Sequence, residues 1–576
     1  MTEFFVSVAG DDSADGTSGQ PFKTLERARI AVRDATGDVT VHLRRGVHTL
    51  TAPLRLAVED SGRDGRITYQ AYGYGTDDCE SVQISGGRQI TDWRVKDGVW
   101  LAEVGDLDTR QLYVNGQRAE RAGIDAIPGD AERTPTGYRT NDLSPLVWRA
   151  PAGVEFVYRG IYPWTEARCG VESVSAHDGS AVITMAQPNF AKAVELYNFA
   201  WDGHAMTGPG LPTRVENDPA FLTEPGGFVL DRTRPGRHVL HYLPRPGEDP
   251  AVTRVVAPSL ETLLSIDGTR GIAFKGLTFA DATWLKPNGD NGFLHYHGSG
   301  YFTGGGVDKV TIAEGSWVTV PRQSQTIPAC VSLNDSTEIR FEECRFTRLG
   351  ATALGMAGGA DLTVRGCDFD LVAASAISVS GSRDTTIVDN LIQHVGLDYS
   401  GSPGVAITDT VNCTVAANHV REVPHCGIVA GPGKGTRILR NLTTGTMNVM
   451  ADGGGIYLSS VQGDSHGNGA VVSGNVINDT RTPYNFGLYT DYGAAWVTVV
   501  DNVVFGADNT AVLTVNPPLE NVVYRGNFWD AEPMGANDIP ATVTYQDNTT
   551  ITDGVEFAEA TAAIRARAGL ERNRTI

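Results

Sequence analysis

A short motif recurs through the second half of the chain, in which a small residue precedes two apolar residues separated by a variable one. Its copies begin at Ala376, Gly404, Gly427, Gly455, Gly487 and Ala511. The spacings between these starting positions are 28, 23, 28, 32 and 24 residues. A repeat of this length in strand-type sequence is typical of a solenoid, in which each coil buries its apolar face only when neighbouring coils stack on it.

A second motif interleaves with the first, an Asn followed by an apolar, strand-like pair. It occurs at Asn390, Asn418, Asn441, Asn475, Asn502 and Asn527, and Cys344 and Cys367 occupy the same slot upstream. Two motifs with one period predict at least two short strands and two turns per coil. We therefore predict an all-β fold, a right-handed parallel β-helix, with turn Asn side chains stacked at ~4.8 Å from coil to coil.

The rest of the chain lacks this period. Residues 21–33 are predicted to form a helix that caps the open end of the solenoid, and residues 553–571 a helix that can cap the other end. We divide the chain into an N-terminal strand and cap helix, a β-rich accessory domain, the parallel β-helix and a C-terminal helix or tail, at residues 1–64, 65–250, 251–545 and 546–576.

Composition and the N-terminal residues limit the binding partners and the cellular compartment that we expect for this protein. The chain carries 47 Lys and Arg against 68 Asp and Glu, and the net charge of -21 disfavours nucleic acid and anionic membranes as partners. The first residues lack the basic and apolar regions of a secretory signal, so we expect a cytoplasmic protein, or a secreted one if a leader was removed. Seven cysteines without a CxxC pair are expected to be reduced thiols. The oligomeric state is left open.

The strand alternation assigns the faces of each coil. Ile456 and Leu458 are predicted to point inward, which leaves Tyr457 on the outer face. In the next coil, Tyr489 and Asp491 occupy the same outer strip. Two stacked tyrosines beside a carboxylate suit a carbohydrate platform, because aromatic faces pack against the C–H groups of sugars.

A candidate catalytic pair follows from this strip. Asp452 precedes three glycines, which allow almost any turn, and two carboxylates flanking a bond are the minimum for glycoside hydrolysis. We predict Asp452 and Asp491 as this pair. In ideal register they lie about 20 Å apart at ~3.3 Å per residue, so the glycine turn must fold back over the sheet to reach the ~5–9.5 Å that the reaction needs. Asp464 or Asp409 could replace one of them.

The extra residues of the longest spacings form loops beside the pair, and such loops are where binding sites form. The predicted substrate-binding residues are Tyr457, Tyr489, His425, His466, Asp464, Asp409 and Tyr399. No cofactor is predicted. His394, His425 and His466 lack partners at metal-ligand spacing, so no metal site is predicted, although Asp- and Asn-rich turns leave a structural Ca²⁺ open.

Several segments resemble bacterial right-handed β-helix glycoside hydrolases, most like family 141, with families 120 and 136 more distant. They span residues 5–17, 21–29, 111–119, 274–279, 282–284, 452–457 and 488–491. The resemblance covers nearly the whole chain and implies a glycosidase, with Trp284 as a further substrate-binding candidate; family 141 is associated with α-L-fucosidase and xylanase activities. Where relatives often read Asp-Glu-Gly, this chain has Asp491-Tyr492-Gly493.

Two other classes of function remain open. One is a polysaccharide lyase or a fructotransferase on the same fold. A lyase needs a base and usually a cation or Arg to neutralise a uronate, and the outer strip is poor in Lys and Arg. The other is a non-catalytic carbohydrate-binding solenoid, which would need neither the three glycines nor the acidic loops. Our preferred prediction is hydrolysis of a neutral oligo- or polysaccharide.

Overall fold

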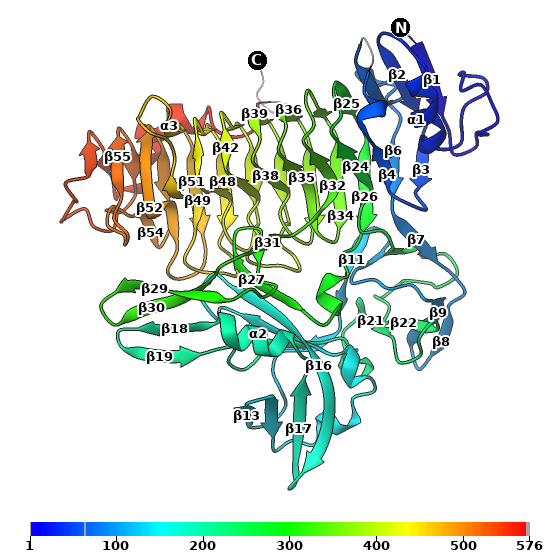
Figure 1. Ribbon diagram of the computed structural model, residues 1–576, viewed down its shortest axis with the longest axis horizontal. Coiled ribbons are helices and arrows are strands. Elements are labelled where there is room, and N and C mark those ends of the chain that lie inside the picture. Colours follow the sequence, from blue (N-terminus) through cyan, green and yellow to red (C-terminus); the bar gives the residue numbers. More distant parts are fainter. Residues whose placement is uncertain (1, 63–64, 572–576) are drawn as a thin grey trace.

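The computed structural model describes residues 2–62 and 65–571, and its main body is a right-handed parallel β-helix, as predicted (Figure 1). A typical coil contributes three strands, and each pairs in parallel with the equivalent strand of the next coil. In one such pair of coils the strands are β35 (Thr352–Ala357), β36 (Ala360–Arg365) and β37 (Asp368–Val372), followed by β38 (Ile377–Ser380), β39 (Arg383–Val388) and β40 (Leu391–Gln393).

Apolar side chains stack in columns along the inside of the coils. One column runs through the first strand of successive coils, with every member fully buried, at Ile377, Val405, Ile428, Ile456 and Leu488. Each such burial stabilises the fold by about 1.5–3 kcal/mol relative to exposure. The residues between them face outward. The apolar positions of the repeated motif therefore form the inner wall of the solenoid.

The asparagines form the predicted ladder at one turn. Asn441 donates from Nδ2 to Asn475 Oδ1 at 3.0 Å, and its Oδ1 accepts from Asn418 Nδ2 at 2.9 Å. The same contact joins Asn390, Asn418, Asn441, Asn475, Asn502, Asn527 and Asn548 in order. Asn390 Oδ1 also accepts from the backbone N–H of Cys367, which occupies the same slot one coil earlier. Because these side chains are almost all buried, the ladder satisfies polar groups that would otherwise lie unpaired in the core.

The N-terminal helix covers the start of the solenoid. Helix α1 (Leu25–Arg33) begins at Thr24, whose side chain accepts from the N–H of Arg27, and it buries Leu25, Ala28 and Val32 against the first coils. Two segments that we assigned to the accessory domain belong to these coils. Strand β5 (Ile67–Ala71) pairs with β2 (Val39–Leu43), and β6 (Val82–Ser85) lies in the sheet of third strands.

The accessory region consists of two insertions rather than one segment. Mostly antiparallel strands between residues 87 and 258 form its larger part. The chain then forms solenoid strands β24 (Leu264–Asp267) to β26 (Thr278–Ala282), and leaves again at β27 (Phe293–His297), which pairs with accessory strand β16 (Glu166–His177). The boundaries differ from those expected because strand alternation in an insertion looks the same as strand alternation in a coil.

The second insertion lies beside the solenoid. Its hairpin of β29 (Val307–Ala313) and β30 (Ser316–Pro321) pairs with β18 (Asn198–Trp201) of the first insertion, and Figure 1 shows it running along the coils. The chain rejoins the β-helix at β32 (Ala329–Asn334). The two insertions therefore form one accessory body beside one flank of the solenoid.

The C-terminal helix does not close the last coil. Helix α3 (Gly554–Arg565) packs Phe557 on Phe505 with ring centroids 5.6 Å apart, and also on Val476 and Val503. Beyond the helix, the N–H of Glu571 donates to Asp389 Oδ1 at 2.7 Å, several coils back. The chain therefore returns along the outside of the solenoid, because α3 packs its apolar side chains on outward-facing strand residues and buries them.

All seven cysteines are free thiols, and six are buried. Among the described residues, no helix is both long and apolar enough to cross a membrane.

Candidate active site

The outer strip that carries the two tyrosines is formed by β49 (Gly454–Val461) and β52 (Phe486–Val500). These strands pair with Tyr457 opposite Tyr489 and with Ser459 opposite Asp491. The two phenol rings meet edge to face, with centroids 5.2 Å apart and planes at 88°. Both rings are 6% exposed, so they form the floor of the site rather than a flat outer surface.

The glycine turn brings Asp452 over this floor. Asp452 has a φ of 55°, and its N–H donates to the carbonyl of Tyr484 in the next coil at 2.8 Å. A Cβ atom on Gly453 would lie 2.6 Å from His425 Nε2 and 2.7 Å from Cys426 Sγ. A side chain at residue 453 would therefore push the turn away from the sheet, which explains why glycine follows Asp452.

The two predicted catalytic acids lie on either side of one tyrosine hydroxyl. Tyr489 Oη donates to Asp452 Oδ1 at 3.2 Å, and the same hydroxyl interacts with Asp491. Tyr457 Oη donates to Asp491 Oδ2 at 2.9 Å. The 20 Å separation of an ideal flat register therefore does not apply, because the turn folds Asp452 back towards the strip.

The two carboxyl groups have different electrostatic environments. Burial, together with the nearby charge of Asp491, raises the pKa of Asp452 to about 7. Burial also raises the pKa of Asp491, but the backbone N–H of Tyr492 and the hydroxyls of Tyr457 and Tyr489 oppose this shift by stabilising the carboxylate. Near neutral pH, the geometry favours a proton on Asp452 and a negative charge on Asp491.

Histidines from the accessory body complete one side of the site. The ring of His297, at the end of β27, lies 5.3 Å from the ring of Tyr457. Burial and the neighbouring His295 lower the pKa of His297 to about 4, and burial with both of these histidines lowers the pKa of His425 to about 3. These imidazoles are therefore neutral at pH 7, and each can donate or accept a hydrogen bond without adding charge.

His295 and His297 were not among the predicted site residues. They alternate in the segment Phe-Leu-His-Tyr-His at 293–297, a strand pattern that places both on one face. Nothing in the repeat pattern links this segment to Tyr457, because it lies in the second insertion. The pairing of β27 with β16 in the accessory body decides where they lie.

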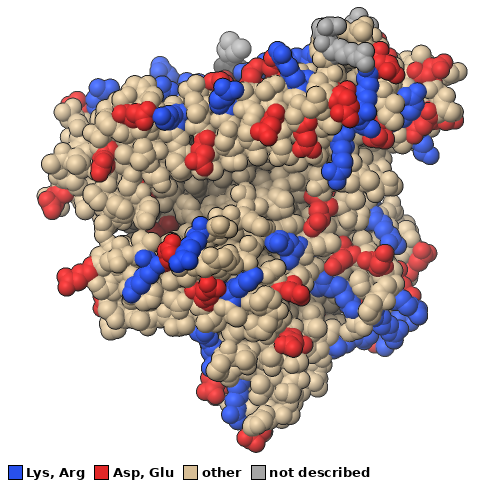
Figure 2. Space-filling model, viewed as in Figure 1, with Lys and Arg blue, Asp and Glu red and all other residues tan. Residues whose placement is uncertain are grey.

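Further aromatic side chains lie beside the two tyrosines of the floor. Phe486 packs on Tyr489 with ring centroids 4.1 Å apart, and Tyr484 packs on Phe486 at 5.7 Å. Tyr484 and Tyr492 are 51% and 46% exposed, so their rings are accessible from solvent. Figure 2 shows a hollow along the line where the accessory body meets the solenoid, with few charged side chains on its visible walls.

Three predicted residues do not lie with this group. Asp464 forms an ion pair with Lys434 at 2.9 Å, and His466 packs against Trp496 at 5.4 Å, both on an exposed loop. Asp409 is exposed in the coil of β41 (Val405–Thr408), which is three coils from that of Asp491, or about 14 Å at ~4.8 Å per coil. Neither Asp464 nor Asp409 replaces a member of the pair.

Tyr399 and Trp284 are buried and do not reach the strip. Tyr399 is 0% exposed, and Trp284 is 4% exposed. Their rings pack on each other with centroids 5.2 Å apart and together on Phe293. They form part of the core between the solenoid and the accessory body, because large aromatic rings are the side chains that fill such a junction most effectively.

Comparisons with known proteins agree with the fold. A family model described as "Right handed beta helix region" matches residues 307–463 and 399–528. A solved structure described as "Glycoside hydrolase" aligns over 99% of both chains with 23% identity and a TM-score of 0.76. A structure titled "The complex structure of XylC with xylose" aligns over 95% of this chain and 83% of its own, with 13% identity and a TM-score of 0.53.

A lacto-N-biosidase of glycoside hydrolase family 136 from Eubacterium ramulus aligns over 96% of this chain and 68% of its own, with 11% identity and a TM-score of 0.37. A search of curated protein sequences found no match. The family model and the "Glycoside hydrolase" structure establish a β-helix fold, and none of the comparisons identifies family 141.

Proposed function

We propose that this protein is a glycoside hydrolase that cleaves a neutral oligo- or polysaccharide at the Asp452–Asp491 pair. The observation that carries the proposal is that one hydroxyl, that of Tyr489, reaches two largely buried carboxyl groups whose surroundings differ. When two titratable groups have different environments, their pKa values differ, and one can act as the acid while the other acts as the base.

The pKa shifts of the two acids support different roles for them. Asp452, with a pKa of about 7, carries the proton that is donated to the leaving glycosidic oxygen. Asp491 is held as a carboxylate by its hydrogen-bond donors and either attacks the anomeric carbon or removes a proton from water. The proton lost by Asp452 is recovered from the water that completes hydrolysis, so the reaction is balanced without a further reactant.

The surroundings favour an uncharged sugar. The exposed rings of Tyr484 and Tyr492 provide apolar surface near the acids, and His297 and His425 are neutral at pH 7. Among the described contacts, neither Asp452 nor Asp491 has a Lys or Arg partner. A lyase acting on a uronate would need such a cation or a metal ion to neutralise the sugar carboxylate.

The test is a panel of aryl glycosides and neutral oligosaccharides that includes xylosides and α-L-fucosides. Hydrolysis releases the aryl group or a new reducing end, whereas elimination adds absorbance at about 235 nm from an unsaturated product, and binding without chemistry does neither. We expect new reducing ends with no absorbance change. Elimination products, or calorimetric binding with no turnover on any sugar of the panel, would refute the proposal.

A further inference from the structure

A cavity of about 360 Å³ lies between the accessory body and the solenoid, away from the acid pair. We call it the arginine cavity. Its walls are formed mainly by charged side chains, at Arg118, Glu120, Arg121, Arg159, Arg168, Arg214, Glu216, Leu397 and Asp398. The lining carries five arginines against three carboxylates, a local positive excess in a chain with a net charge of -21.

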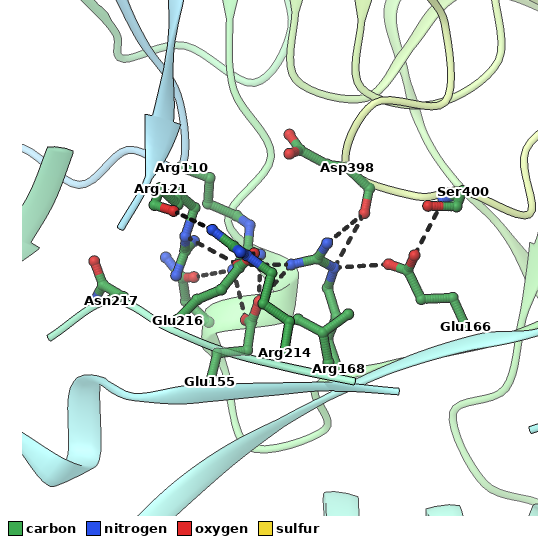
Figure 3. A network of polar contacts seen from close by, with 12 residues as sticks. Arg110, Arg121, Glu155, Glu166, Arg168, Arg214, Glu216, Asn217, Asp398 and Ser400 are labelled. Atoms are coloured by element: carbon green, nitrogen blue, oxygen red, sulfur yellow. Dashed lines mark hydrogen bonds and ion pairs between the residues drawn. The ribbon is translucent and has the colours of Figure 1, made fainter. Parts of the chain in front are cut away.

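The charged network behind this wall is shown in Figure 3. Arg110 forms a two-pronged ion pair with Glu155 at 2.8 Å for both contacts, and Arg118 pairs with Asp398. Arg168 donates to Glu155, Glu166 and Glu216 and to the backbone carbonyl of Asp398. Each buried carboxylate of the network therefore has at least one guanidinium partner.

Positive charge is concentrated on the lining of the cavity rather than in the network as a whole. Four buried carboxylates and the exposed ones of Glu120 and Asp125 balance six guanidinium groups in number; the buried ones belong to Glu155, Glu166, Glu216 and Asp398, and the guanidinium groups to Arg110, Arg118, Arg121, Arg159, Arg168 and Arg214. The residues that line the cavity itself carry five guanidinium groups and three carboxylates. The inner surface of the cavity therefore favours an anion.

Arg121 carries a buried hydrogen-bond donor without an acceptor in the described part of the chain. It is only 7% exposed, and its Nε has no hydrogen-bond partner among the described residues. Its ion pair is a 3.6 Å contact to Glu216, which Arg168 and Arg214 already share at 3.1 and 3.0 Å. Burial lowers the pKa of Arg121 to about 10, which still leaves it charged at pH 7. A buried guanidinium without full hydrogen bonding is costly.

We propose that the arginine cavity binds a small molecule bearing an oxyanion, a carboxylate, sulfate or phosphate group, with Arg121 as its principal partner. The planar guanidinium matches the paired oxygens of such groups. The cavity volume falls at the lower end of the ~300–1,000 Å³ range of small-molecule sites, so the ligand is about the size of one charged sugar or less. Arg159 and Arg214, both partly exposed, lie on the side open to solvent.

The test is isothermal titration calorimetry on the full chain at constant ionic strength in a chloride buffer. Sodium phosphate, sodium sulfate and glucuronate are titrated separately, so that the preferred probe distinguishes a phosphate, sulfate or sugar carboxylate source. We expect saturable binding of at least one probe with a Kd below about 1 mM, or about −4 kcal/mol. Arg121→Gln is expected to weaken it at least tenfold.

The matched control is Arg237→Gln, which removes an exposed arginine paired with Glu103 and is expected to bind as the unmodified protein does. If Arg121→Gln fails to fold, Arg159→Gln replaces it, with the same expected weakening. The proposal is overturned if no probe binds the unmodified protein saturably, or if loss of the cavity arginine leaves the affinity unchanged. Activity on glycosides is not the readout, so this result is independent of the proposed hydrolase function.

Discussion

Tyr489 donates a hydrogen bond from its hydroxyl to Asp452 Oδ1 across 3.2 Å, although 37 positions separate the two residues in the chain. Tyr489 lies on the outer strip of one coil, while Asp452 precedes the strand of the coil before it. This contact places a carboxyl group from a turn above a floor of tyrosines, where Asp491 already lies.

The first prediction concerns the acids themselves. Asp452→Asn and Asp491→Asn are each expected to lower kcat by more than ~100-fold with the fold intact, because each variant lacks a group that gives or takes a proton or attacks the sugar. Turnover on the best substrate of the panel and circular dichroism measure the two effects. The matched controls are Asp409→Asn and Asp464→Asn, which are expected to keep most activity. Retention of activity by either variant of the pair would remove that residue from the mechanism.

The second prediction concerns pH. Because Asp452 must carry its proton, kcat/KM is expected to fall as pH rises through about 7, the pKa of this group. The acidic limb reports Asp491, which must be ionised. Rates measured from pH 4 to 9 give both limbs. An activity that stays constant from pH 6 to 9 would mean that Asp452 is not the acid.

The third prediction concerns stability. The pKa of Asp452 is raised on folding from 3.8 to about 7, so its favourable contribution is complete below about pH 4 and is lost as pH rises to 7. Asp452→Asn removes a buried charge and is expected to stabilise the protein at pH 8 by on the order of 2 kcal/mol. Thermal unfolding at pH 5 and pH 8 measures this. A gain equal at both values would show that titration of Asp452 is not its source.

The fourth prediction tests the role of the Tyr457 hydroxyl. Tyr457→Phe keeps the ring but removes the hydroxyl that donates to Asp491 at 2.9 Å. Because this bond stabilises the carboxylate, its loss raises the pKa of Asp491 and is expected to move the acidic limb of kcat/KM to higher pH. Tyr301→Phe, which removes a hydroxyl bonded to Gln325, is the control. An unmoved acidic limb would argue against Asp491 as the ionised partner.

The fifth prediction concerns the ladder. Asn441→Ala leaves the N–H and Nδ2 of Asn418 without their acceptor inside the core. We expect a loss of about 3 kcal/mol in the free energy of unfolding, since each unsatisfied buried group costs ~1–3 kcal/mol. Denaturant unfolding measures it. Asn537→Ala, which removes an exposed side chain at a residue without a positive φ, is expected to cost under about 1 kcal/mol, and equal losses would contradict a special role for the ladder.

Much of the fold follows from patterns that are local in sequence. The alternation of Ile456, Tyr457 and Leu458 decides which side chains enter the core, because successive residues of a strand face opposite ways. The recurring Asn marks one turn of each coil, because stacked amides satisfy one another at the spacing of the strands. A repeated local rule leads to the same structure in every coil, so the sequence by itself determined the solenoid and the position of the tyrosine strip.

Only the tertiary structure decided the contacts between segments that share no sequence pattern. The fold of the glycine turn brings Asp452 to Tyr489, and the pairing of the second insertion brings His297 to Tyr457. The same packing buries Tyr399 and Trp284 and surrounds Arg121 with charge. These contacts depend on how far side chains reach across coils and on how an insertion docks, and periodicity contains no information about either.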